Sequence, residues 1–333
     1  MTIFIVLALG MGLSTRLYFF RESFLAELAI SFLPYFATGF SIVAIITVVL
    51  FLLRRHKKPR TTRRKIETSF LAGFFLRSTA LGMLYGSEFF NFYALRENPV
   101  PASSGLNIYY ANILYTNEDY TSLEKQIEKA DPDVVVLVEF STDHANAMQD
   151  FFQERFPYMN GVSRSSLVAG NMVFSKYPLT DMLKNHPYKS GRRRANYVAI
   201  TYEGEEYYFY VVHTSAPVSE YNFQMRNQQL KKLKEDILSQ AQERPDNAKV
   251  IVLGDFNLSP WSAFYEKFLQ GIEDRLINVF QGEKPVSTRS LWDQKILNVH
   301  IDQVFTSPSV RSSNIVVSDL PGSDHNGITL TIQ

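Results

Sequence analysis

A long apolar stretch near the N-terminus constrains the fold of this chain more than any other feature of the sequence. Residues 35–53 carry no charged side chain. A helix of about 20 predominantly apolar residues crosses the hydrocarbon core of a bilayer, so we predict a transmembrane helix over this stretch.

Two further apolar segments flank the predicted helix. Residues 1–20 form a shorter run, for which a signal peptide is the rival interpretation, although no small-residue cleavage site follows. Residues 70–95 form the other candidate, interrupted by Arg77 and Glu88; the alternative here is an amphipathic helix in the membrane interface. We therefore expect residues 1–96 to form a membrane anchor of two to three transmembrane helices.

A basic loop separates the second and third candidates. Residues 54–65, RRHKKPRTTRRK, contain eight lysines and arginines, and short loops of this kind stay on the cytoplasmic side. A nucleic-acid patch is the alternative, but the position at a membrane boundary favours the topological interpretation. We expect a multi-pass protein of the cell membrane (inner or plasma membrane) with its C-terminal domain outside the cytoplasm. An even number of transmembrane helices reverses that orientation.

The pattern of the sequence changes after a linker rich in Pro and Ser, residues 97–105. Short apolar runs there alternate with amphipathic helices. Residues 134–140, VVVLVEF, form a continuous apolar run, as expected for a strand that is buried on both faces. We predict one α/β layered domain over residues 106–333.

Two local patterns refine this prediction. Residues 197–214 indicate two strands joined at Glu203 and Gly204, and such a hairpin excludes a purely parallel sheet. Ser259 and Pro260 are typical of the N-cap and first turn of a helix, so a helix is expected to begin there.

Polar side chains stand where several of the predicted strands end. They are Glu139, His213, Asp255 with Asn257, and Asp302. Charged and imidazole groups are rarely buried unless they are paired or bind a metal. Their recurrence at strand ends therefore indicates one shared site at the rim of a sheet.

The residue types at these strand ends indicate a hard cation. Oxygen ligands such as Glu139, Asp255, Asn257 and Asp324 suit Mg²⁺ or Mn²⁺ rather than Zn²⁺. Histidines in strand-end motifs add proton-transfer capacity near neutral pH. Such a set suits the attack of water on a phosphate ester.

Each residue also has a simpler interpretation when it is taken alone. Glu139 would only end a strand, and the GDFN sequence around Asp255 and Asn257 would only form a turn. The SDHNG sequence, residues 323–327, would only be a loop of turn formers. Three histidines without such a context are interpreted as surface or structural residues: His144, His186 and His300.

The order of the motifs is more specific than any one of them. It runs Asn112 in YYANIL, Glu139 in VVVLVEF, His213 in VVHTSAP, Asp255 and Asn257 in GDFN, Asp302 in IDQVF, and Asp324 and His325 in SDH. In this order and spacing, residues 106–331 resemble the endonuclease/exonuclease/phosphatase superfamily. The resemblance implies a deoxyribonuclease I-like, four-layer α/β/β/α sandwich with the active site at one edge of the two sheets. The apolar N-terminus and GDFNLSPWS resemble its membrane-anchored bacterial branch.

The resemblance also implies a role for each motif residue. Glu139 would be the principal ligand of a Mg²⁺ ion, or of Mn²⁺ in its place, with Asn112 and Asp324 supporting the metal site. Gln303 departs from the family pattern, in which many members have His after the Asp. That position is not among the core catalytic ones.

The remaining motif residues would act on water and on the phosphate. His325 would be the general base or would contact a phosphoryl oxygen, and Asp302 would orient and polarise its imidazole. Asp255 would hold or deprotonate the attacking water, a role that competes with that of His325. Asn257 would donate to the phosphoryl oxygens, and His213 would protonate the leaving group or bind the phosphate.

The net charge of the whole chain says little about its partners, because 34 basic residues are balanced by 33 acidic ones. Arg192, Arg193 and Arg194 form a local basic cluster that could bind substrate phosphates, but a solvated loop is the favoured interpretation. The chain has no cysteine, which excludes disulfides, thiolate metal sites and cysteine nucleophiles.

We therefore predict a membrane-anchored, metal-dependent hydrolase of phosphate esters, of the phosphodiesterase or endonuclease type. The alternatives are a phosphatase or phosphodiesterase directed at phospholipids or inositol phosphates, and a non-catalytic binding domain on the same fold. The HTSAP context of His213 favours nucleic acid as substrate, whereas anchoring favours a phospholipid headgroup. The lipid bilayer is the other expected partner, and no protein partner is evident.

Overall fold

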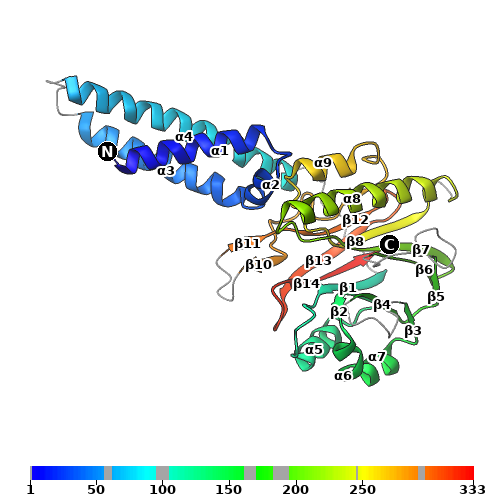
Figure 1. Cartoon of the computed structure of the whole chain (residues 1–333). Helices are drawn as coiled ribbons and strands as arrows, with labels where there is room; N and C mark the ends of the chain where they lie inside the picture. The colour runs from blue at the N-terminus through cyan, green and yellow to red at the C-terminus, as the bar shows by residue number, and fades with distance from the viewer. Residues whose placement is uncertain are drawn as a thin grey trace. The chain divides into compact units, whose positions relative to one another are not determined.

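The computed structural model describes residues 2–55, 62–94, 105–160, 170–182, 195–244, 247–291 and 297–333 (Figure 1). The chain divides into two compact units: Met1–Leu95 with Trp261–Ala263, and Arg96–Pro260 with Phe264–Gln333. Residues 97–104 of the predicted linker and the centre of the predicted basic loop lie outside the described residues.

The first unit is helical. Its helices are α1 (Thr2–Phe19), α2 (Phe24–Ile30), α3 (Leu33–Arg55) and α4 (Thr62–Ala94). Within the described part of the chain, one helix is long and apolar enough to cross a membrane, Leu33–Leu53 in α3, with a mean hydropathy of 2.6. It contains the stretch for which the sequence predicts a transmembrane helix. The other spans, the multi-pass topology and the extracytoplasmic orientation stay predictions.

The two charges that interrupt residues 70–95 are paired across helices. Glu88 on α4 accepts a hydrogen bond from the Tyr18 hydroxyl of α1 at 2.7 Å and lies 3.3 Å from Arg21. Arg77 donates to the Thr15 hydroxyl of α1 at 3.1 Å. Polar groups inside an apolar helix bundle are costly unless they are satisfied in this way, so these contacts join α1 to α4.

The second unit contains two six-stranded sheets. The first has the order β13 (Ser312–Asp319), β14 (Asn326–Ile332), β1 (Leu106–Asn112), β2 (Val134–Phe140), β4 (Gly170–Ser175) and β3 (Tyr158–Asn160). The second has the order β5 (Leu179–Asp181), β6 (Ala195–Tyr202), β7 (Glu205–His213), β8 (Lys249–Asp255), β12 (Asp302–Thr306) and β9 (Ile277–Asn278). A separate two-stranded antiparallel sheet pairs β10 (Arg289–Leu291) with β11 (Leu297–Val299).

Helices cover the outer faces of this pair of sheets. Figure 1 shows α5 (Tyr120–Ala130), α6 (Thr142–Ala147) and α7 (Gln149–Arg155) on one side, and α8 (Glu220–Ala241) and α9 (Ala263–Leu269) on the other. Leu123 and Ile127 form the apolar face of α5 and pack against Tyr109 and Val135 of the first sheet. The four-layer α/β/β/α sandwich is therefore confirmed.

Both sheets are mixed. The pairs β1–β2 and β7–β8 are parallel and central, and the other pairs are antiparallel. The predicted hairpin at Glu203 and Gly204 is the β6–β7 connection. The predicted helix start at Ser259 is wrong, because α9 begins at Ala263. Ser259 is fully buried, and the Leu258 carbonyl is held by the Gln303 side chain at 2.9 Å, so core contacts keep this segment in turns.

Candidate active site

Strand register brings the predicted residues of the second sheet into one row. His213 at the end of β7 is the neighbour of Asp255 at the end of β8, which is in turn the neighbour of Asp302 at the start of β12. In the first sheet, Asn112 ends β1 and Glu139 lies near the end of β2. The two sheets meet here, because the Asn112 amide donates to Asp255 at 3.1 Å.

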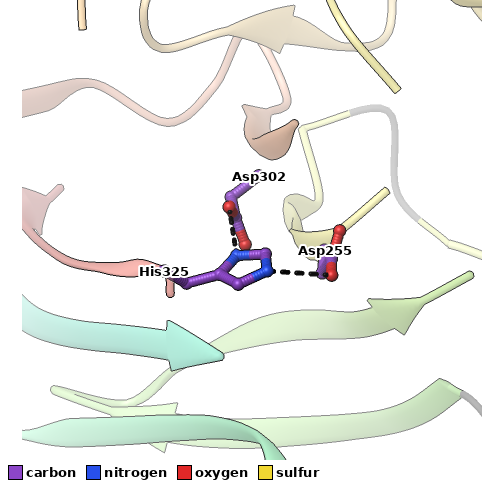
Figure 2. A group of neighbouring side chains, drawn as sticks. All are labelled: Asp255, Asp302 and His325. Atoms are coloured by element: carbon purple, nitrogen blue, oxygen red, sulfur yellow. Dashed lines mark hydrogen bonds and ion pairs between the residues drawn. The ribbon is translucent and has the colours of Figure 1, made fainter. Parts of the chain in front are cut away.

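A buried ion pair forms the centre of this edge. In Figure 2 the His325 ring lies between Asp302 and Asp255, and its Nδ1 is 2.8 Å from Asp302 Oδ2. Its Nε2 lies 3.7 Å from Asp255 Oδ2. The Tyr110 hydroxyl donates to the other oxygen of Asp302 at 2.5 Å. Both oxygens of Asp302 are therefore engaged, and the imidazole presents Nε2 to Asp255.

The charges of this pair stabilise each other. Burial lowers the pKa of His325, but attraction to Asp302 and Asp255 outweighs it and raises the pKa to about 9. Burial raises the pKa of Asp302, and the imidazolium, Tyr110 and Thr288 together bring it below its ordinary value. The pair is thus an imidazolium facing a carboxylate at neutral pH. For Asp255, burial dominates and raises the pKa despite the attraction of His325.

Glu139 occupies a strained position beside this pair. Its φ of 64° lies in the left-handed region, which a non-glycine residue rarely adopts. Its Oε1 accepts from the Asn112 amide at 3.2 Å, and its Oε2 accepts from the Tyr115 backbone N–H at 3.1 Å. His213 Nε2 lies 3.7 Å from Glu139 Oε1. The strained backbone turns this carboxylate toward the row of strand ends.

The GDFN turn is held on several sides. Asn257 has a φ of 46°, and its backbone N–H donates to Asp255 Oδ1 at 2.8 Å. Its side-chain amide donates to the Thr214 carbonyl at 3.2 Å. The fully buried Arg226 of α8 donates to the Asn257 carbonyl at 2.9 Å. The asparagine is thereby fixed next to Asp255 and to the loop that follows His213.

The sequence model of the Endonuclease/Exonuclease/phosphatase family matches residues 106–325. The chain belongs to this family. Members of the family hydrolyse phosphoester bonds, and this is the class of enzyme to which the chain is assigned. No curated protein sequence matches the chain significantly.

Solved structures agree on the fold. The crystal structure of humanized D. rerio TDP2 has a TM-score of 0.54 at 20% identity, over 69% of this chain and 100% of that one. The human Nocturnin catalytic domain has a TM-score of 0.53 at 15% identity, over 71% of this chain and 97% of that one. An endonuclease/exonuclease/phosphatase family protein from Bacteroides thetaiotaomicron has a TM-score of 0.52 at 16% identity, over 69% and 98%.

Two groups of residues in this family domain are candidates for holding a cation. Asp255, Asp302 and His325 offer ligand atoms within 4.8 Å of one another. However, Asp302 is fully buried and its carboxylate is paired with the His325 imidazolium, so a hydrated cation has no access to it. The other group is Asn112, Glu139 and Asp324. The carboxylates of Glu139 and Asp324 suit a hard cation, and their side chains are 19% and 35% exposed. The Asn112 amide oxygen accepts from the Leu114 backbone N–H at 3.1 Å and keeps one lone pair for a cation. Because its carboxylates are accessible, this second group is the better candidate for holding a divalent cation.

Three residues of the family domain contact the site but escape sequence reasoning. Tyr110 shares the inward face of β1 with Asn112, so period-2 alternation would have been a signal. The Thr288 hydroxyl accepts from the Asp302 backbone N–H at 3.0 Å. Arg289 donates to Asp324 Oδ2 from Nε at 2.9 Å. Thr288 and Arg289 lie in a segment without periodicity, so the sequence carries no comparable signal for them.

Other sequence predictions lie away from this edge. Arg192, Arg193 and Arg194 fall outside the described residues. His144 is buried in the capping box of α6, and His300 is buried against Phe280, so both are structural as interpreted from the sequence. His186 also falls outside the described residues.

Proposed function

We propose that the family domain is a metal-dependent phosphodiesterase with its active site at the sandwich edge. The observation that carries the proposal is the convergence there of a buried His325–Asp302 ion pair, Asp255, and the Asn112–Glu139 pair. The whole-domain match to the family supports the class of reaction. Each of these residues would take a distinct role in hydrolysis.

Glu139 would hold Mg²⁺ or Mn²⁺, with Asn112 and Asp324 completing the protein ligands. Their amide and carboxylate oxygens are the donors that these cations prefer. When bound, such a cation polarises a phosphoryl oxygen and offsets the charge that develops on it. It would also compensate part of the negative charge that Glu139, Asp255 and Asp324 bring to this edge.

Asp255 would take a proton from the water that attacks phosphorus. Burial raises its pKa, which makes it a stronger base than an exposed aspartate. His325 would donate from Nε2 to a phosphoryl oxygen, because Asp302 engages its Nδ1. The Asn257 side-chain amide would donate a hydrogen bond to the same phosphoryl group once its hydrogen bond to the Thr214 carbonyl breaks.

His213 would deliver a proton to the leaving alkoxide. Its Nε2 lies between Glu139 Oε1 and Asp255 Oδ2, at 3.7 and 3.9 Å, and the side chain is 18% exposed, so a substrate can reach it. The protons balance over the reaction: water loses one to Asp255, the P–O bond to the leaving group breaks, and the alkoxide gains one from His213.

The substrate class that we propose is a phosphodiester. A structure of D. rerio TDP2, with a TM-score of 0.53, is complexed with single strand DNA product, which supports a nucleic acid. The apolar helix Leu33–Leu53 supports a location at a membrane, where a phospholipid headgroup is the second candidate. We propose that this helix anchors the enzyme and that the family domain lies outside the cytoplasm.

The test is hydrolysis of bis(p-nitrophenyl) phosphate by the full chain in detergent micelles. We expect activity with added Mg²⁺ that EDTA abolishes, and a loss of at least ~10³-fold in Glu139→Gln and in His325→Ala. Glu154→Gln is the matched control, because the Glu154 side chain is 72% exposed on α7. Single-stranded DNA and phospholipid vesicles then separate the two substrate candidates.

Absence of cleavage of every one of these esters by a folded wild-type chain would sink the proposal and favour a non-catalytic binding domain. Equal activity of Glu139→Gln and Glu154→Gln would show that Glu139 is not the ligand of an essential cation. Activity that survives EDTA would show that the hydrolysis does not depend on a divalent cation.

A further inference from the structure

Arg289 is fixed next to the active site by backbone contacts. Its strand β10 makes an isolated antiparallel bridge from Arg289 to His325. The Ser290 backbone N–H donates to the Asp324 carbonyl at 2.7 Å, and the Asn326 backbone N–H donates to the Thr288 carbonyl at 2.8 Å. These bonds flank His325 on both sides, so Arg289 keeps a set position relative to Asp324 and His325.

The guanidinium uses only part of its donor capacity on the protein. Nε and Nη2 lie 2.9 and 2.8 Å from one and the same oxygen, Asp324 Oδ2. A guanidinium carries five N–H donors, and Nη1 makes no hydrogen bond to any described residue. The side chain remains 29% exposed. One edge of the cation is thus held, and the other is available to a ligand.

The electrostatic surroundings keep this group charged. Burial lowers the pKa of Arg289, but the carboxylates of Asp324, Asp255 and Asp302 raise it above its ordinary value. Its interaction with Asp255 and Asp302 also places it within electrostatic range of the centre of the site. A pre-oriented, weakly hydrated guanidinium is well suited to an anionic phosphate oxygen, since little freedom is lost on binding.

We propose that Arg289 binds a non-bridging phosphoryl oxygen of the substrate through the free edge of its guanidinium, while Asp324 fixes the orientation of that edge. The inference rests on the proposed function, because it assigns a phosphate-binding residue to the same site. A phosphodiester has two non-bridging oxygens. One would face Asn257 and His325, and the other would face Arg289.

A purely structural role makes a different prediction. If Arg289 only oriented Asp324, its loss would weaken metal binding, whereas a residue that binds phosphate affects KM and phosphate affinity. The experiment therefore measures three quantities in the full chain: KM for bis(p-nitrophenyl) phosphate, the half-saturating Mg²⁺ concentration, and the dissociation constant of inorganic phosphate by titration calorimetry.

In Arg289→Gln we expect KM and the phosphate dissociation constant to rise by about 10- to 100-fold, the range of a charge-assisted hydrogen bond. The half-saturating Mg²⁺ concentration should stay within about 3-fold, and Arg289→Lys, which keeps the charge but not the planar fork, should lose less. Arg311→Gln is the matched control, because Arg311 is exposed and pairs with Gln333, beyond the opposite end of β14.

Unchanged phosphate affinity in both Arg289 variants would overturn the inference. So would a loss of phosphate affinity that is accompanied by an equal rise in the half-saturating Mg²⁺ concentration. If Arg289→Gln fails to fold, the Lys variant decides on the same criteria. A wild-type chain that hydrolyses no ester but loses phosphate binding on Arg289→Gln would refute the proposed function and leave the phosphate site standing.

Discussion

Replacing Tyr110 with phenylalanine tests the buried ion pair directly. The Tyr110 hydroxyl donates to Asp302 Oδ1 at 2.5 Å, and both residues are fully buried. Phenylalanine keeps the ring but leaves this carboxylate oxygen without its partner. A hydrogen bond to a charged group contributes about 1.5–3 kcal/mol, so we expect Tyr110→Phe to lower the free energy of unfolding by about 2 kcal/mol at pH 7.

The adjacent residue of β1 provides a matched control. Tyr109 is 1% exposed and donates to the neutral side chain of Gln126 at 3.1 Å. Tyr109→Phe therefore removes the same hydroxyl from a neutral hydrogen bond, worth about 1 kcal/mol. In thermal melts of the full chain in detergent, we expect Tm to fall by about 4–8 °C in Tyr110→Phe and by about half of that in the control.

Activity and pH separate the two variants further. Only Tyr110→Phe should lose hydrolysis, by about 10- to 100-fold, because Asp302 then orients His325 less well. The pKa of Asp302 is lower in the folded chain than its ordinary value of 3.8, so its contribution to stability exists above that value and is lost as pH falls below it. The Tm difference between Tyr110→Phe and wild type should therefore shrink below pH ~4. Equal stability and equal activity of the two variants would refute the reasoning.

Three other described residues give further tests of the fold and the site. Gly254→Ala should abolish the folded domain, measured by circular dichroism and solubility, because a Cβ there would lie 1.9 Å from the Val212 carbonyl oxygen; a soluble, active variant would contradict the β7–β8 register. Burial lowers the pKa of His300 from 6.5 to about 4, so the folded chain binds fewer protons than the unfolded chain between these values and loses stability as pH falls. The wild-type chain should lose about 2 kcal/mol of stability through His300 when the pH falls from 7 to 5, and His300→Gln should not show this loss. Parallel curves of Tm against pH for variant and wild type would show that His300 does not cause it. Gln229→Ala removes the side-chain oxygen that accepts from the Ser215 backbone N–H at 2.8 Å, so kcat should fall while Tm changes little; an unchanged kcat would show that this contact does not position the loop after His213.

The sequence indicates which residues gather at this edge where local patterns determine their position. Glu139 and Asp255 follow continuous apolar runs, which are recognisable as buried strands. Each lies at the end of one of the two parallel pairs, β1–β2 and β7–β8, which belong to different sheets. Tyr110 and Arg289 escape prediction for a different reason. Alternation along β1 places Tyr110 on the face of Asn112 but does not reveal its partner Asp302, which lies 192 residues away in sequence. Arg289 reaches its position through a backbone bridge to His325.

The boundary of α9 illustrates the same limit at the level of secondary structure. Ser259 and Pro260 have the local chemistry of a helix start, yet the helix begins at Ala263. The Gln303 side chain, which holds the Leu258 carbonyl, belongs to a strand that comes much later in the chain. Tertiary contacts of this kind override local propensity and cannot be read from a window of sequence.

The contacts between the two sheets have a consequence for how the enzyme acquires its activity. Asn112 and Asp255 are 143 residues apart in sequence, and Tyr110 and Asp302 are separated by still more of the chain. Closing such long loops is slow, because the entropic cost precedes the gain from the contacts. A refolding chain should therefore recover its circular dichroism signal well before it recovers hydrolysis. Catalytic turnover would then serve as a reporter of the last step of folding, the docking of one sheet on the other.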